Sequence, residues 1–256
     1  TDPAQKARGF ELGGVDWICK PVERLELLAR VRTHIELAGA RKALEIRAAL
    51  LEQVTATQTA RLDEVRIGQE DLLTQASTIT DVAIAVRFQP AHEAGGDFYE
   101  LVQLSDDMSG FLVADVSGHD LSVPYITGAL KALSLTFMNE ALALEETMLL
   151  MNASLRKLLA DRHYVTACYG RFSRSAMEVE IVSAGHPPAL FQSQGHGSRP
   201  VEGRGDILGM LELVRFEPHR FRVAPGDRLL LYSDGVTEGY VDSLGRRGRA
   251  AWGAER

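Results

Sequence analysis

The sequence predicts a mixed α/β fold of the α+β type, in which helices cover antiparallel sheets. Residues 80–256 hold many short strand signals and two consecutive helix signals, and turn residues separate several of the strands. A βαβ repeat would alternate single helices with strands, so this order favours antiparallel pairing. With 45% hydrophobic and 25% charged residues, the composition is that of a globular protein and not of a disordered or collagen-like chain.

The elements of residues 80–256 follow from local periodicity and turn chemistry. Apolar residues alternate from Val82 to Phe88, as in a half-buried strand, and the apolar run 111–114 is a second strand that ends at Asp115. The helix signals span residues 122–139 and 145–159. Two strand pairs are expected: a hairpin of 165–172 with 177–182, and a pair of 221–223 with 228–232 across Pro225-Gly226-Asp227.

Residues 1–38 indicate a helix, a strand, a turn and a second helix, which is too little chain for a domain. The segment from Lys6 to Leu12 is amphipathic, and residues 15–19 are rich in strand-forming side chains. From Glu23 to Leu37 apolar residues recur at helical spacing.

Residues 39–79 predict a long, polar helix without proline. Its apolar residues follow one seven-residue stride that is interrupted at Gln58: Leu37, Leu44, Leu51, Val65 and Leu72. A single amphipathic helix lying on the next domain is one interpretation. A two-stranded coiled coil is favoured, because one helix this long and polar has little to bury alone. We therefore expect a homodimer that pairs through residues 39–79.

Charge and cysteine content exclude several classes of protein. Lys and Arg total 28 against 35 Asp and Glu, a net charge of −7, which argues against binding nucleic acid through a basic face. No apolar run is long enough to cross a bilayer, and residues 1–20 lack the layout of a signal peptide, so we expect no membrane partner. Cys19 and Cys168 are the only cysteines, which excludes a disulfide framework and a cysteine zinc site and favours the cytoplasm.

Three short segments place an Asp beside glycine or another small residue, and two of these directly follow an apolar strand. The acidic residues are Asp97, Asp115 and Asp234. Each segment alone is more often a turn than a ligand site. If the three carboxylates converged within about 4 Å, each pair would repel by roughly 4 kcal/mol at an effective dielectric near 20, and protonation or cations would have to relieve that. All-oxygen ligands prefer hard ions, so Mg²⁺ or Mn²⁺ is expected.

Four ordered motifs make the resemblance specific. They are Gly95-Gly96-Asp97-Phe98-Tyr99, Asp115-Val116-Ser117-Gly118-His119, Ala184-Gly185-His186-Pro187-Pro188 and Ser233-Asp234-Gly235-Val236-Thr237-Glu238. In order and approximate spacing they resemble those of the SpoIIE-like metal-dependent protein phosphatases, the bacterial branch of the protein phosphatase 2C superfamily (PPM). The resemblance runs from about Val82 to the last residue. It implies an α-β-β-α sandwich with a metal centre at one end of the two sheets.

The same resemblance implies roles for particular residues at a centre of two Mn²⁺ or Mg²⁺ ions. Asp115 resembles the carboxylate that bridges the metals, and the Val116 carbonyl resembles a backbone ligand. Asp234 resembles a ligand of the first metal, and Asp97 the acidic residue that reaches the other metal directly or through water. The implied reaction is hydrolysis by a metal-activated water, which needs no phosphoenzyme.

The histidines of the motifs have weaker assignments. His119 is either a general acid for the leaving serine or threonine oxygen or a loop histidine that supports the Asp115 turn. A structural role is favoured for His186. Thr166 and Asn152 also match family positions, and we interpret both as supports of the fold.

Two features depart from the family pattern. Asp120 stands where these phosphatases usually have glycine, which adds a carboxylate near the expected site. The family's last metal-ligand Asp lies in a C-terminal strand, and this chain stops at Arg256 before that point. Because it also begins at Thr1 without Met, we expect either a piece of a longer protein or a degenerate, inactive member.

The first residues resemble a second family. The run Gly13-Gly14-Val15-Asp16-Trp17-Ile18-Cys19-Lys20-Pro21, followed by a leucine-rich helix, is similar to the last third of a response-regulator receiver domain. Lys20 matches the lysine that contacts the phosphoryl group there, and the Lys-Pro bond is commonly cis. The resemblance implies an upstream histidine kinase. The phosphoacceptor Asp of such a domain would precede this chain.

Together these features predict three regions: residues 1–38 from a receiver, residues 39–79 as a helical coiled-coil linker, and residues 80–256 as a phosphatase domain that lacks its C-terminal end. We hypothesise a response-regulator output phosphatase that acts on phosphoserine or phosphothreonine of a partner protein, by resemblance an anti-sigma-factor antagonist. The alternative is an inactive, phosphatase-like adaptor that binds such a protein without turnover. A coiled-coil scaffold is disfavoured, because it has no use for clustered carboxylates.

Overall fold

The computed structural model describes residues 3–73, 79, 82–89, 95–118, 120, 122–159, 162–201, 203–237, 239–241 and 247–249. These residues form two compact units, 1–61 and 62–256. The long helix α2 (Arg24–Leu72) contributes residues to both units.

The first unit contains the helix α1 (Pro3–Glu11) and the start of α2. The predicted strand at residues 15–19 is wrong, since these residues join no ladder among the described strands. They are held by side chains instead. Asp16 accepts hydrogen bonds of 2.9 and 3.0 Å from Arg30, and the Trp17 ring lies against Gly9 of α1. The Lys20–Pro21 peptide is cis and Lys20 is exposed.

Helix α2 runs without a break for 49 residues, so the helix predicted from Glu23 and the one predicted within 39–79 are one element. Gly39 and Gly68 do not interrupt it. None of its residues is buried, and Leu44 and Leu51 of the apolar stride are 65% and 67% exposed. The coiled-coil pairing stays a prediction. None of the described helices combines the length and the apolar character needed to span a membrane.

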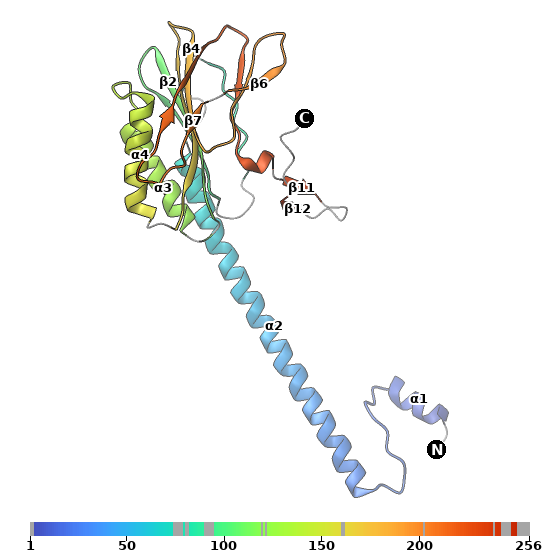
Figure 1. Cartoon of the computed structure of the whole chain (residues 1–256). Coiled ribbons are helices and arrows are strands. Elements are labelled where there is room, and N and C mark those ends of the chain that lie inside the picture. The colour runs from blue at the N-terminus through green and yellow to red at the C-terminus, as the bar shows by residue number, and fades with distance from the viewer. Residues whose placement is uncertain are drawn as a thin grey trace. The chain divides into compact units, whose positions relative to one another are not determined.

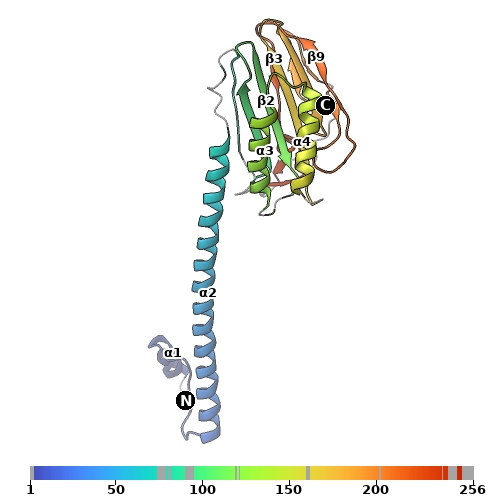
Figure 2. The same ribbon diagram turned by 90° about the vertical axis from the view of Figure 1, so that its left-hand side faces the viewer.

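The second unit is built on a five-stranded antiparallel sheet with the order β1-β2-β3-β4-β9. Its strands are β1 (Asp97–Gln103), β2 (Met108–Val116), β3 (Val165–Ser173), β4 (Glu178–Ala184) and β9 (His219–Arg222). The helices α3 (Val123–Phe137) and α4 (Leu144–Leu159) lie together on one face of this sheet (Figure 1, Figure 2). The predicted consecutive helices and the β3–β4 hairpin are confirmed.

A smaller sheet with the order β10-β5-β6 packs on the other face of the large one. Its strands are β5 (Leu190–Gln192), β6 (Ser198–Pro200) and β10 (Arg228–Leu230). Two short pairs complete the described strands, β7 (Arg204–Gly205) with β8 (Phe216–Glu217), and β11 (Gly239–Val241) with β12 (Arg247–Arg249). The single-turn 3₁₀ helix η2 covers Asp234–Val236.

Two strand predictions in this unit are wrong. The segment from Val82 to Phe88 joins no ladder among the described residues. The segments 221–223 and 228–232 do form strands, but β9 pairs with β4 while β10 pairs with β5. Their apolar residues, such as Phe221 and Leu229, pack on one core from opposite sheets. A turn between two strands therefore does not establish that they pair with each other.

The core has two parts, one on each face of the large sheet. The part under the helices takes residues from α4 at helical spacing, which are Leu144, Met148, Met151, Leu155 and Leu159. The other part lies between the two sheets and includes Ile181 and Phe191. The described residues thus supply three layers of the expected sandwich, namely the helices, the large sheet and the small sheet.

A buried ion pair joins α3 to the strand that begins at Asp97. Lys131 of α3 donates a 2.6 Å hydrogen bond to the carboxylate of Glu100 in β1, whose side chain is only 3% exposed. Ser134 also donates to this carboxylate, at 3.3 Å. Because a buried charge is costly without a partner, this pair fixes the helix against β1.

Candidate metal centre

Two of the predicted ligands face each other at the end of the large sheet. Asp97 at the start of β1 pairs in register with Asp115 near the end of β2. The preceding residue, Gly96, makes this approach possible. A Cβ atom added to Gly96 would lie 2.7 Å from Asp115 Oδ1 and closer still to the Val116 carbonyl oxygen. Any side chain at residue 96 would therefore collide with both oxygen atoms.

The third predicted carboxylate reaches the same end of the sheet through its neighbour. Ser233 donates a 3.1 Å hydrogen bond to Asp97 Oδ2, across 136 residues of sequence, and Asp234 follows in η2. Burial raises the pKa of Asp97, the Ser233 hydrogen bond opposes this, and the negative charge of Asp234 raises the pKa further. A half-buried carboxylate beside a like charge is the situation that a cation relieves.

His186 contacts β3, the strand that neighbours the one carrying Asp115. Its Nδ1 is 2.9 Å from the hydroxyl of Thr166, the residue that pairs with Asp115 in register, and its backbone is held by Ser183. Burial lowers the pKa of His186 to about 4, and the Tyr232 backbone and the Asp234 charge oppose this effect only in part. A neutral, buried ring of this kind is suited to supporting the strand ends.

Asn152 supports a different loop. Its side chain donates to the Leu211 carbonyl at 3.0 Å and accepts from the Gly209 amide at 2.8 Å, so it ties α4 to residues 209–211. These contacts agree with the fold-supporting role expected from the sequence.

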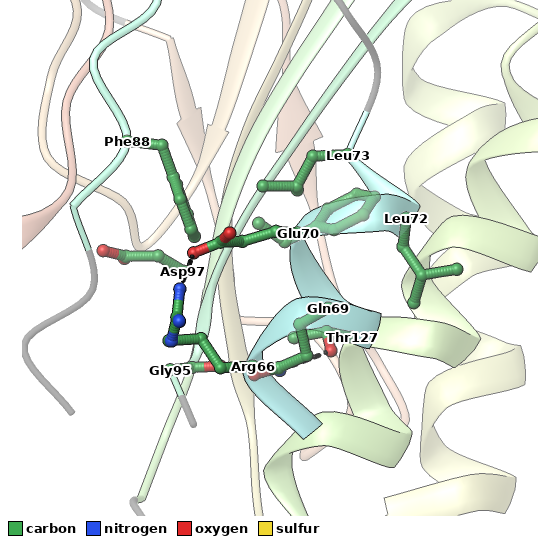
Figure 3. Close-up of a pocket in the computed structure, with 10 residues that line it drawn as sticks. Arg66, Gln69, Glu70, Leu72, Leu73, Phe88, Gly95, Asp97 and Thr127 are labelled. Atoms are coloured by element: carbon green, nitrogen blue, oxygen red, sulfur yellow. Dashed lines mark hydrogen bonds and ion pairs between the residues drawn. The ribbon is translucent and has the colours of Figure 1, made fainter. Parts of the chain in front are cut away.

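The end of α2 packs beside the predicted ligands, within the second unit. Gln69 donates hydrogen bonds of 3.1 Å to the Gly95 carbonyl and 3.0 Å to the Thr127 hydroxyl of α3. Arg66 and Glu70, one turn apart on the same helix, form a 2.7 Å ion pair. Figure 3 shows these side chains around a narrow crevice, whose lining is completed by Leu72, Leu73, Phe88, Asp97 and Phe98.

The structure brings together Asp97, Asp115 and the Val116 carbonyl, with Asp234 adjacent. Within the described part of the chain, however, no three His, Cys, Asp or Glu side chains lie close enough together to hold a metal ion. His119 lies outside the described residues, and Lys20 belongs to the first unit. The atoms that the predicted metal ligands offer are all oxygen atoms, so the type of donor fits a hard divalent cation.

Sequence reasoning missed Gln69 and the specific contact of Ser233. Ser233 was visible only as part of the Ser-Asp-Gly motif, and nothing in the sequence pairs it with Asp97. For Gln69 there was no signal, because its partners lie 26 and 58 residues away along the chain.

Comparison with known proteins shows which family the sequence is similar to. The family description Stage II sporulation protein E (SpoIIE) matches residues 105–252, which is more than half of the chain. Phosphoserine phosphatase RsbP of Bacillus subtilis (strain 168) is 29% identical over 181 residues, covering 69% of this chain and 45% of that protein. Phosphoserine phosphatase RsbU of the same organism is 23% identical over 150 residues, covering 58% of this chain and 44% of RsbU. The chain thus spans less than half the length of these curated relatives.

A solved structure shows the same fold. The SiaA-PP2C domain of Pseudomonas aeruginosa superimposes with a TM-score of 0.60 at 19% identity, covering 75% of this chain and 78% of that one. The matched residues include Asp115 and Asp234, and the two relatives and this fold point to the same family. The chain belongs to the SpoIIE family.

Proposed function

We propose that this protein is a metal-dependent protein phosphatase that hydrolyses phosphoserine or phosphothreonine on a partner protein. The observation that carries the proposal is the meeting of Asp97 and Asp115 in register, beside a glycine where an added Cβ would collide with Asp115 Oδ1 and the Val116 carbonyl oxygen. The names of RsbP and RsbU, both phosphoserine phosphatases, support the same reaction class.

Asp97, Asp115, Asp234 and the Val116 carbonyl would hold one or two Mn²⁺ or Mg²⁺ ions. When bound, such ions would polarise the phosphoryl oxygens and activate a water molecule as the nucleophile. Other residues of the chain hold the ligands in place. Ser233 orients the Asp97 carboxylate, and Thr166 and His186 support the strand beside Asp115. His119 is the last residue of the Asp115 motif and is the candidate for giving a proton to the leaving serine oxygen.

A direct test measures phosphate release from a phosphoserine peptide with Mn²⁺ present and after EDTA. Hydrolysis that requires the metal supports the proposal. Binding of the phosphopeptide without any turnover, under the same conditions, would support the alternative of an inactive adaptor. That alternative draws on the finding that no three ligating side chains gather within the described residues.

For the substrate we propose a phosphorylated anti-sigma-factor antagonist, as the family resemblance implies. The acidic balance of the chain, with 35 Asp and Glu against 28 Lys and Arg, adds no information on this choice. Comparing kcat/KM for such a phosphoprotein with that for an unrelated phosphopeptide tests it. Equal values for both would contradict a dedicated substrate.

We further propose that receiver phosphorylation by a histidine kinase controls the phosphatase through a dimer of the α2 helices. Gln69 supports this proposal, because its side chain joins α2 to the Gly95 carbonyl, two residues before Asp97, and to Thr127 of α3. Gln69→Ala should change activity while leaving Mn²⁺ affinity unchanged, whereas Gln53→Ala, at an exposed position of the same helix outside the apolar stride, should behave as wild type. Equal activity of both variants and wild type would contradict control through Gln69.

A further inference from the structure

The loop that follows β2 is tied to the residues that precede β3. Ser117 donates its backbone N–H to the Tyr164 carbonyl at 2.9 Å, and Tyr164 donates its own N–H to the Ser117 hydroxyl at 2.8 Å. His163 adds a side-chain contact, because its Nδ1 lies 2.7 Å from the Ser117 carbonyl oxygen. Three hydrogen bonds thus converge on the residue directly after Val116.

The other edge of the His163 ring is also held. Its Nε2 lies 2.9 Å from the Ser122 hydroxyl and 3.4 Å from Asp120 Oδ2. Ser122 in turn donates its backbone N–H to Asp120 Oδ1 at 2.8 Å, and its hydroxyl contacts the same oxygen. The His163 side chain is only 10% exposed, so the ring is fixed on both edges inside a small polar cluster.

The direction of one of these bonds follows from chemistry alone. A carbonyl oxygen can only accept a hydrogen bond, so Nδ1 of His163 must carry the hydrogen and donate it to Ser117. The ring also lies against Gly118, whose φ is +96°, and an added Cβ there would be 3.2 Å from the ring. Residues 117 and 118 can therefore take this path only with a glycine beside His163.

We propose that His163 is a positioning residue for the metal-binding loop, an inference that rests on the proposed function. By holding the Ser117 carbonyl it fixes the Ser117–Gly118 peptide, which is one peptide beyond the one that carries the Val116 carbonyl and whose neighbour is tied to Tyr164. It thereby constrains the path of the chain directly after Val116. Asp120 and Ser122 hold the ring in place. Asp120 stands where SpoIIE-like phosphatases usually have glycine, so the cluster of Asp120, Ser122 and His163 gives this chain an added support for that loop.

The test compares two amide variants that differ only in reach. In His163→Asn the side-chain N–H₂ falls where Nδ1 was and can still donate to the Ser117 carbonyl. In His163→Gln the amide reaches toward Ser122 instead. We would titrate each full-length protein with Mn²⁺ alone by calorimetry, and we would measure the melting temperature and kcat/KM on a phosphoserine peptide.

The expected result is that His163→Gln weakens Mn²⁺ binding about tenfold, the lower end of the loss that removal of an outer hydrogen bond around a metal site commonly causes. His163→Asn should stay within about threefold of wild type, since it keeps the single neutral hydrogen bond in question. Equal Mn²⁺ affinity for the two variants, whether both match wild type or both are weakened alike, would overturn the proposal.

Two further variants keep the proposal testable if substitutions at His163 lower the folded fraction. Asp120→Gly and Ser122→Ala remove the outer contacts and leave the ring in place, and each should weaken Mn²⁺ binding by a smaller factor than His163→Gln. If both bind Mn²⁺ as wild type does, the supporting cluster is refuted. If wild type itself binds no Mn²⁺, the proposed metal site fails, which is a result distinct from failure of the role of His163.

Discussion

The closest contact at the candidate metal centre predicts that Gly96→Ala damages activity more than stability. The new Cβ would lie 2.7 Å from Asp115 Oδ1 and 3.1 Å from the Val116 amide nitrogen. Ordinary contact distances are about 3.5 Å, so the ends of β1 and β2 must separate by roughly 1 Å. Shifts of this size at a reacting centre cost about 100-fold in rate, which corresponds to about 2.7 kcal/mol in the barrier.

The loss of stability should be smaller, about 1 kcal/mol, at the low end of the range for overpacked sites, because the clash lies at the ends of the strands. Gly128→Ala in α3 is the matched control, because its Cβ would meet only Leu72 Cδ1, at 4.0 Å, and alanine is the better helix former by about 1 kcal/mol. Phosphate release at saturating Mn²⁺ measures the activity of both variants, and thermal melts measure their stability. Wild-type activity in Gly96→Ala would refute the reasoning that a side chain at residue 96 displaces Asp115 and Val116.

Three further predictions follow from buried polar groups. Lys131→Met should destabilise the protein by about 3 kcal/mol in urea unfolding, because it leaves Glu100 buried without its cation, and the double variant with Glu100→Gln should recover much of the loss. Folding lowers the pKa of His186 from 6.5 to about 4, so the folded state binds fewer protons than the unfolded state. The free energy of unfolding should therefore fall as the pH drops below 6.5, by about 2 kcal/mol between pH 7.5 and pH 5. His186→Gln should flatten this pH profile. Burial raises the pKa of Cys168 to about 12, so a thiol reagent at pH 7.5 should label exposed Cys19 in the native protein and leave Cys168 unmodified until unfolding.

Local patterns predicted the helical layer well. The helix predicted at residues 145–159 is α4 (Leu144–Leu159), and the structure buries its Leu155 and Leu159 against the sheet. The hairpin of β3 and β4 was likewise accessible, because a short polar turn joins two adjacent strands. In each case the determining residues lie within about 20 positions of one another.

Strands whose partners are distant could not be derived in this way. Residues 15–19 and the segment from Val82 to Phe88 have strand-forming composition, but a strand exists only where a second strand supplies hydrogen bonds. Alternation also fails to say which sheet a strand joins, since Phe221 and Leu229 face one core from opposite sheets.

The same distinction between local patterns and distant partners holds for the residues of the candidate site. Asp97 and Asp115 were accessible from their motifs, and their register places them opposite each other. The groups that hold them were not, because Ser233 reaches Asp97 across 136 residues and His163 reaches Ser117 across 46. Chemistry-bearing residues are therefore visible in the sequence, while the residues that orient them depend on the complete fold.

The most direct test of the central claim is phosphate release by the full-length protein and by Asp115→Asn, each assayed on a phosphoserine peptide with Mn²⁺ and with EDTA. The account predicts release by wild type only with the metal, no release by Asp115→Asn, and the same melting temperature for both apoproteins. Release that persists in EDTA, or an Asp115→Asn variant as active as wild type, would contradict a metal-dependent phosphatase centred on Asp115.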